Sequence, residues 1–129
     1  VQLVNPKKVY CIDNGFVDIN SVSFNDDKGR LLENMVFLQL RRNTPEIFYF
    51  SEKKECDFVV FQNGKLHSLY QVSWQLDQNN MDRELTGLIE AMEYFGQKQA
   101  KIITFDQSDT FSIEGKTIIA QPFNEWATQ

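Results

Sequence analysis

The chain has 129 residues, of which 42% are hydrophobic and 13% aromatic, so it is long enough and apolar enough to bury one hydrophobic core. A charged fraction of 24% excludes a globally disordered chain. A net charge of −5 argues against strong non-specific binding to a nucleic-acid backbone, because such binding needs Lys and Arg to displace counterions. We expect a single domain over residues 1–129.

The cysteines and the apolar runs of the sequence indicate in which cellular environment the chain is expected. The two cysteines form no CxxC motif and no disulfide framework, which favours a reducing, cytoplasmic environment. No apolar run approaches the roughly 20 residues of a membrane helix, and the first residues lack a signal-peptide pattern, so no membrane partner is expected. The chain begins VQLVNP without Met, from which we expect a fragment of a longer protein or a processed chain.

The first part of the chain predicts one strand and one long helix. Residues 8–13 are typical of a short strand, whereas residues 14–27 indicate no regular structure. Residues 28–43 predict a helix that Pro45 prevents from continuing. Apolar side chains occupy so much of its circumference that we expect it to be buried on most sides.

The second part predicts strands around a second helix. Residues 81–97 give the clearest helical pattern, with apolar side chains at the 3.6-residue period and Gly96 marking the C-terminal end. Residues 100–105 are short and apolar enough to form a strand buried on both faces. The other predicted elements are strands at residues 46–51, 55–61 and 66–74, a hairpin of residues 110–113 with 117–121, and a last helical turn at residues 124–128.

This order of elements predicts an α/β or α+β fold. We expect one mixed sheet that is flanked on its two faces by the helices at residues 28–43 and 81–97. The sequence contains no internal repeat, low-complexity tract or linker that would divide it.

The stretch ECDFVVFQNGKLHSLYQVSW, residues 55–74, reads as two strands joined by an Asn-Gly turn. Side chains alternate between faces along a strand, and the polar side chains here fall at odd positions. A simple two-residue turn would place Asp57 opposite Tyr70 and divide the polar set between the two faces. We therefore predict a bulge or a longer loop, such as a three-residue loop over residues 63–65, that places Asp57 opposite Gln71.

This polar set suggests a metal site of the kind that nucleases use. A nuclease uses Mg²⁺ to make a nucleophilic water and to stabilise charge on the phosphate, and Mg²⁺ prefers carboxylate oxygens. Asp57 can supply one carboxylate, Gln71 offers only a neutral carbonyl oxygen, and Ser73 supplies no positive charge. The competing interpretation is a solvated polar face on an edge strand.

Glu33 is the other candidate metal ligand beside Asp57. It lies inside an apolar helix, where a carboxylate must be paired, hydrogen-bonded or bound to a metal. Either it points at the Asp57 end of the sheet and completes an acidic site, or it pairs with Arg30, Arg41 or backbone amides. His67 is a lone histidine with no Ser or Cys geometry implied, so the pattern does not favour catalysis by it.

The ordered runs in this chain resemble a known family. NPKKVYCIDNGFVD, GRLLENMVFLQLRR, IFYFSEKKECDFVV, LYQVSW, MDREL and NEW are together similar to the C-terminal domain of a large bacterial and archaeal group of AAA-type P-loop ATPases. The resemblance covers residues 5–126, and the ordered set is more specific than any one run. It implies a PD-(D/E)xK, restriction-endonuclease-like core in a domain usually catalogued as of unknown function. It also implies a parent ATPase whose ATP-binding part precedes this fragment.

The resemblance also implies a degenerate catalytic site. Glu33 matches the helix acid and Asp57 matches the acid of the second core strand. Gln71 and Ser73 fall where the third strand of an active member carries an acid and a Lys. The residues that could substitute for them are Glu55, as a replacement ligand, and Lys54, as a displaced cation.

Three functions therefore remain open. The first is a catalytically degenerate, nuclease-like domain that recognises nucleic acid, a partner protein or its own ATPase domain. The second is an active metal-dependent nuclease with a migrated site and Mg²⁺ as cofactor, and the third is a structural module that holds ATPase subunits together. Gln71 and Ser73 favour the first and third functions over the second, and the oligomeric state is not predicted.

Overall fold

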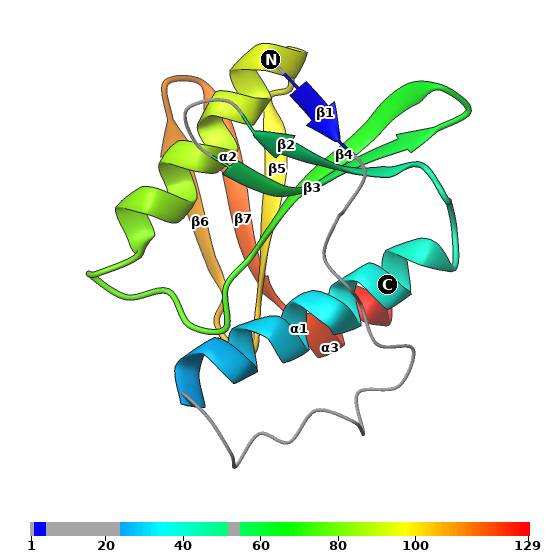
Figure 1. Cartoon of the computed structure of the whole chain (residues 1–129). Coiled ribbons are helices and arrows are strands. Elements are labelled where there is room, and N and C mark those ends of the chain that lie inside the picture. The colour runs from blue at the N-terminus through cyan, green and yellow to red at the C-terminus, as the bar shows by residue number, and fades with distance from the viewer. Residues whose placement is uncertain (1, 5–23, 52–54) are drawn as a thin grey trace.

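The computed structural model describes residues 2–4, 24–51 and 55–129, and within them seven strands form one sheet in the order β1-β2-β3-β4-β5-β7-β6 (Figure 1). The strand predicted at residues 8–13 lies outside the described residues. The strands are β1 (Gln2–Val4), β2 (Ile47–Ser51), β3 (Glu55–Gln62), β4 (Lys65–Val72), β5 (Gln99–Thr104), β6 (Asp109–Ile113) and β7 (Lys116–Pro122).

The sheet is mixed. The strands β1 to β4 pair antiparallel in chain order, whereas β4, β5 and β7 run parallel and β6 returns antiparallel to β7. The parallel step from β4 to β5 requires a crossover connection, which a helix supplies here. The predicted fold class and the predicted order of elements from residue 28 onward are confirmed.

Two long helices cover the sheet, one on each face, as predicted (Figure 1). They are α1 (Phe24–Arg41) and α2 (Met81–Phe95), and a short third helix, α3 (Phe123–Ala127), contacts α1. Among the described residues, no helix is long and apolar enough to cross a membrane.

The helix ends differ from the predicted ends by a few residues. The first helix was predicted over residues 28–43, whereas α1 begins at Phe24 and ends at Arg41. The second helix ends at Phe95 because Gly96 adopts the left-handed conformation, with φ of 70°. A glycine enters this conformation without steric cost, so the assignment of Gly96 as the end signal is confirmed.

Each long helix buries its own side of the core. On the α1 side Val36 and Phe58 are completely buried, and on the α2 side Leu88 is completely buried. The strand β5 contributes to both sides, because Ile102 packs in the α2-side core and Ile103 in the α1-side core. The prediction of a strand buried on both faces is therefore confirmed.

The hairpin between β3 and β4 closes with a two-residue turn, so the three-residue loop suggested for residues 63–65 is wrong. Asn63 and Gly64 have φ of 55° and 77°, as a type I′ turn requires. The carboxylate of Glu46 accepts hydrogen bonds from the N–H of Asn63 at 2.9 Å and from the N–H of Gly64 at 3.0 Å. This charge-assisted contact fixes the turn at two residues.

The predicted bulge is present, but it lies within β4 rather than in the loop. The register changes between Val60 and Phe61 of β3, because β4 contributes an additional residue, His67, at that point. Beyond the bulge the strands bring Asp57 opposite Gln71, so the odd-to-odd pairing is confirmed. Since Glu46 holds the turn, the extra residue has to be accommodated inside the strand.

Candidate functional site

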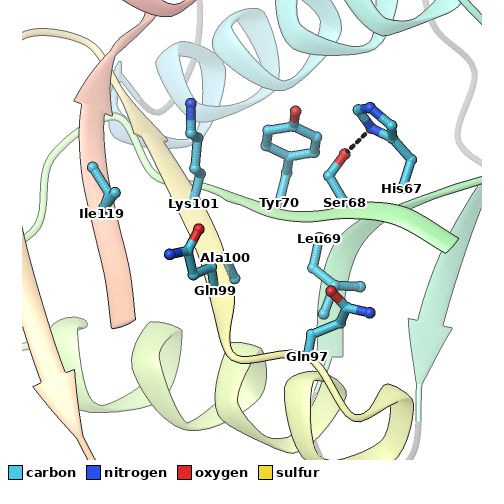
Figure 2. Close-up of a pocket in the computed structure, with 9 residues that line it drawn as sticks. All are labelled: His67, Ser68, Leu69, Tyr70, Gln97, Gln99, Ala100, Lys101 and Ile119. Carbon is cyan, nitrogen blue, oxygen red and sulfur yellow. Dashed lines mark hydrogen bonds between the residues drawn. The ribbon is translucent and has the colours of Figure 1, made fainter. Parts of the chain in front are cut away.

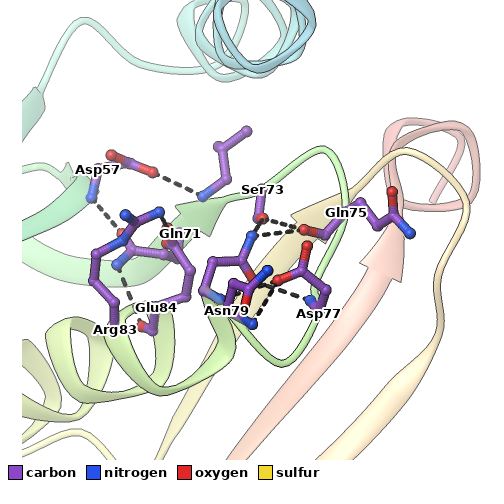
Figure 3. Close-up of polar contacts among 10 residues, drawn as sticks. Asp57, Gln71, Ser73, Gln75, Asp77, Asn79, Arg83 and Glu84 are labelled. Carbon is purple, nitrogen blue, oxygen red and sulfur yellow. Dashed lines mark hydrogen bonds and ion pairs between the residues drawn. The ribbon is translucent and has the colours of Figure 1, made fainter. Parts of the chain in front are cut away.

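Asp57 and Gln71 meet where the β3–β4 ladder ends (Figure 3). The N–H of Asp57 donates to Oε1 of Gln71 at 2.8 Å, and the N–H of Val72 donates to Oδ2 of Asp57 at 2.9 Å. Each side chain thus accepts a main-chain hydrogen bond from the other strand, in place of the carbonyl groups of a continuous ladder. We call this pair of contacts the Asp57–Gln71 tie.

The amide of Gln71 also joins the sheet to α2. Its side-chain nitrogen donates to the carbonyl oxygen of Glu84 at 3.3 Å, and Gln71 is only 4% exposed. An amide suits this position because it accepts at one end and donates at the other. A carboxylate would place an acceptor against the Glu84 carbonyl, so an ionised acid at this position would not make the contact.

Ser73 serves the connection between β4 and α2. Its main-chain N–H donates to the carbonyl of Ile103 at 3.0 Å, and its hydroxyl donates to the carbonyl of Gln75 at 3.1 Å. The side-chain nitrogen of Asn80 donates to the same hydroxyl at 3.5 Å. Ser73 is 8% exposed, so it occupies a buried position in this loop (Figure 3).

The remaining site candidates are Glu33, Glu55 and Lys54. Glu33 is half-buried on α1, between the buried positions Leu32 and Asn34. The described part of the chain contains no group of three or more His, Cys, Asp or Glu side chains that could hold a metal ion. Lys54 lies outside the described residues, and the main chain of Glu55 pairs opposite Ser51 at the start of β3.

The residues of the Asp57–Gln71 tie do not fit a Mg²⁺ site as they are arranged. This ion demands a near-octahedral set of oxygen ligands, and carboxylates are its preferred protein ligands. The two side-chain oxygens that join these strands already accept main-chain N–H groups. This geometry indicates that the two side chains hold β3 and β4 in position relative to each other.

Cys56, next to Asp57 in the sequence, lies in surroundings that disfavour ionisation of its thiol. Cys56 is completely buried in the α2-side core. Burial raises the pKa of the Cys56 thiol far above its usual range, and the negative charges of Asp57 and Glu84 raise it further. The thiol therefore stays protonated at neutral pH, and a nucleophilic role is excluded.

Protection of Cys56 is directly measurable. In a Cys11→Ser background, we expect a thiol reagent such as DTNB to modify the folded chain at least about 100-fold more slowly than the chain in 6 M guanidinium, because the thiolate is the reactive form. The rate on the folded chain should keep rising with pH through about pH 9, whereas the rate of an ordinary thiol levels off above its pKa of about 8.5. The double variant Cys11→Ser/Cys56→Ser, which has no thiol, is the blank for the reagent. Rapid modification of the folded Cys11→Ser chain would contradict the buried, protonated thiol.

A stacked aromatic pair, in which Phe105 is exposed and Trp74 half-buried, lies just past the same end of β4, and the sequence did not indicate it. Phe105 is 49% exposed and stacks on Trp74, with ring centroids 4.3 Å apart and an interplanar angle of 7°. The ammonium of Lys28 lies 5.2 Å from the centre of the Trp74 ring, within the range of a cation–π contact. Phe105 was predicted inside the buried strand, but β5 ends one residue earlier and leaves it exposed.

Gln107 is a second residue that the sequence did not single out. Its side-chain oxygen accepts from the N–H of Leu76 at 2.6 Å, and its side-chain nitrogen donates to the Leu76 carbonyl at 3.0 Å. These contacts join the β4–α2 connection to the β5–β6 connection. Residues this far apart in the sequence carry no local signal of such a contact.

The fold and this site define a small mixed α+β domain in which polar side chains tie strands and loops together. The chain belongs to the DUF4143 family, described as a domain of unknown function, whose model matches residues 28–126. It is 33% identical over 135 aligned positions to the uncharacterized protein MJ1544 of Methanocaldococcus jannaschii. That match covers 96% of this chain and 30% of the relative, so the chain spans less than a third of the relative's length. No solved structure matches this chain.

Proposed function

We propose that this chain is a non-catalytic recognition domain, a nuclease-like accessory domain of an AAA-type ATPase. The observation that carries the proposal is the Asp57–Gln71 tie. The residues at the two nuclease-like positions bind the main chain of the neighbouring strand, at 2.8 and 2.9 Å, rather than facing a common ligand. Gln71 and Ser73 are both buried, which is further support for a structural role.

The surface that performs the recognition is, in this proposal, the Trp74–Phe105 pair. Exposed aromatic side chains are frequent anchors of protein interfaces, because they bury a large area at a small cost in conformational entropy. The net charge of −5 favours a protein surface over a phosphate backbone. The partner we propose is the ATPase part of the same protein, since the chain matches only 30% of its relative's length.

Docking can be tested by calorimetry with the separately produced ATPase part. Phe105→Ala is expected to weaken binding at least about tenfold, because it removes the exposed ring of the pair. Tyr94→Ala is the matched control, since Tyr94 is an aromatic residue of α2 that is 53% exposed. Equal affinities of the two variants would contradict docking through this surface. Self-association of the chain without the ATPase part, seen in sedimentation, would favour the structural assembly module instead.

One observation favours an active nuclease as the second candidate. The negative charges of Asp57 and Glu84 both contribute to raising the pKa of the Cys56 thiol, so two acids influence the same part of the fold. Asp57→Asn tests this candidate, because the variant retains a side-chain oxygen that can accept from Val72 while the charge is lost. We expect no calorimetric heat with Mn²⁺ and no plasmid cleavage by either chain. Metal binding and cleavage by the wild type, both lost in Asp57→Asn, would reinstate the enzyme.

A further inference from the structure

A pocket lined by polar and apolar side chains lies where β4 and β5 diverge (Figure 2). These strands pair in parallel only over their last residues. The pairing begins with Tyr70 opposite Lys101. The preceding residues of the two strands separate and leave a cavity of about 200 Å³. A second hollow of about 220 Å³ shares His67, Tyr70 and Lys101 with it and continues toward the C-terminal end of α1. We call this combined feature the Lys101 pocket.

The bulge in β4 and the register of β5 bring four polar side chains onto one side of the sheet. Ser68 and Tyr70 share a face because side chains alternate along a strand. His67 is the additional residue of the bulge, and its Nδ1 lies 2.9 Å from the hydroxyl oxygen of Ser68. Lys101 lies beside Tyr70 in the parallel ladder. Figure 2 shows the imidazole, the hydroxyl, the phenol and the ammonium pointing to the same side.

This arrangement corrects the view of His67 as isolated from any Ser. Bulges commonly re-aim a side chain, and here the bulge lets sequence neighbours join through their side chains. A regular strand would direct His67 and Ser68 to opposite faces. The sequence could not indicate this pair, because the bulge position depends on how the turn is held.

Lys101 is the one Lys or Arg among the described residues that line the two hollows, although the whole chain carries a net charge of −5. The ammonium of Lys101 donates to the neutral amide oxygens of Gln121 at 3.2 Å and Gln129 at 3.4 Å. No Asp or Glu lies among the described residues that line either hollow. The charge of Lys101 is therefore not paired with an Asp or Glu side chain among the described residues, and an anion can approach it.

We propose that the Lys101 pocket binds a phosphate group, either free or at the end of a larger molecule. Lys101 supplies the charge, the Tyr70 hydroxyl supplies one hydrogen-bond donor, and the Ser68–His67 pair, whose own contact uses one donor, supplies another. A compact ammonium binds phosphate as a point charge, and donors from separate positions can reach several oxygens of a tetrahedral oxyanion. This site is independent of the proposed docking surface and of the Asp57–Gln71 tie.

The test is a titration of the ¹⁵N-labelled chain with inorganic phosphate, with sodium chloride adjusted to hold the ionic strength constant. We expect saturable shifts of the backbone amides of residues 67–70 and 99–101. Lys101→Met should weaken the affinity at least about tenfold, as expected for loss of a charged donor. Lys98→Met removes the same charge from an exposed position outside the pocket lining and should leave the affinity unchanged.

Two further titrations distinguish a terminal phosphate from the free ion, and phosphate from a carboxylate. Methyl phosphate binding more tightly than inorganic phosphate would identify a terminal phosphate as the ligand, and the reverse order would identify the free ion. Equal affinity for acetate would overturn the assignment to phosphate. Shifts that do not saturate, or equal affinities of the Lys101→Met and Lys98→Met variants, would overturn the site itself.

If Lys101→Met does not fold, Tyr70→Phe is the second variant. It removes one hydroxyl and retains the ring packed on Trp126, and an unchanged affinity in that variant would also contradict the proposal.

Discussion

Replacing Gln71 by Glu is expected to lower the free energy of unfolding by about 3 kcal/mol at neutral pH, although the acid matches the pattern of active nucleases. The position is only 4% exposed, so an ionised carboxylate there loses its hydration. The variant also loses the donor to the Glu84 carbonyl and gains a negative charge beside Asp57. The expected result is destabilisation with no gain of metal binding.

The loss of stability in Gln71→Glu should depend on pH. Burial and the neighbouring carboxylates raise the pKa of the introduced carboxyl above its unfolded value of about 4.3, so the unfolded state ionises first as the pH rises. Stability relative to the wild type is therefore retained near about pH 4 and is lost as the pH increases toward about 7. Urea unfolding at several pH values measures this difference. Gln75→Glu, at an exposed position, is the matched control, and an equally small effect in both variants would contradict the structural role of the Gln71 amide.

Phe58→Ala is expected to lower the free energy of unfolding by about 4 kcal/mol, because it removes a completely buried ring and leaves a cavity. Phe58 lies in the α1-side core, with its ring centroid 6.2 Å from that of Phe37 on α1. A loss of this size is a large fraction of the stability of an ordinary domain. It is measured by urea unfolding followed by circular dichroism.

The same substitution at Phe105 separates folding from recognition. Phe105→Ala removes a ring that is 49% exposed, and we expect a loss of about 1 kcal/mol or less from the stack on Trp74. A stability loss in Phe58→Ala no greater than that in Phe105→Ala would show that the α1-side core does not depend on this ring. The contrast also shows whether reduced docking by Phe105→Ala arises without unfolding.

The sequence predicted the features that depend on local pattern. The 3.6-residue period of α2, the end signal at Gly96 and the buried strand β5 all follow from residues close together in the chain, and the structure contains them. The parity of the polar residues also predicted a bulge and the pairing of Asp57 with Gln71. The position suggested for the bulge, in the loop over residues 63–65, was wrong, because the contact of Glu46 with the turn is not visible in the local sequence.

The rest of the site depends on contacts between distant residues. The polar character of Gln71 was visible in the sequence, but its contact with the Glu84 carbonyl depends on where α2 packs. The Lys101 pocket likewise depends on the divergence of two strands and on a bulge, neither of which leaves a local pattern. The start of α1 was predicted late because residues 24–27 are mostly polar, and helices are recognised from apolar periodicity.

The extra residue in β4 has a consequence for aligning relatives of this chain. Measured from the same turn, the residue that faces Asp57 stands one position farther along β4 than a continuous ladder would place it. A relative with the same turn and no bulge would present the position of Tyr70 there instead of Gln71, and every later side chain would exchange faces. An alignment anchored on the Asn-Gly turn without a gap at His67 would then compare residues from opposite sides of the sheet. When acids and lysines of such relatives are aligned with this chain, the alignment should therefore start at Asp57 rather than at the turn.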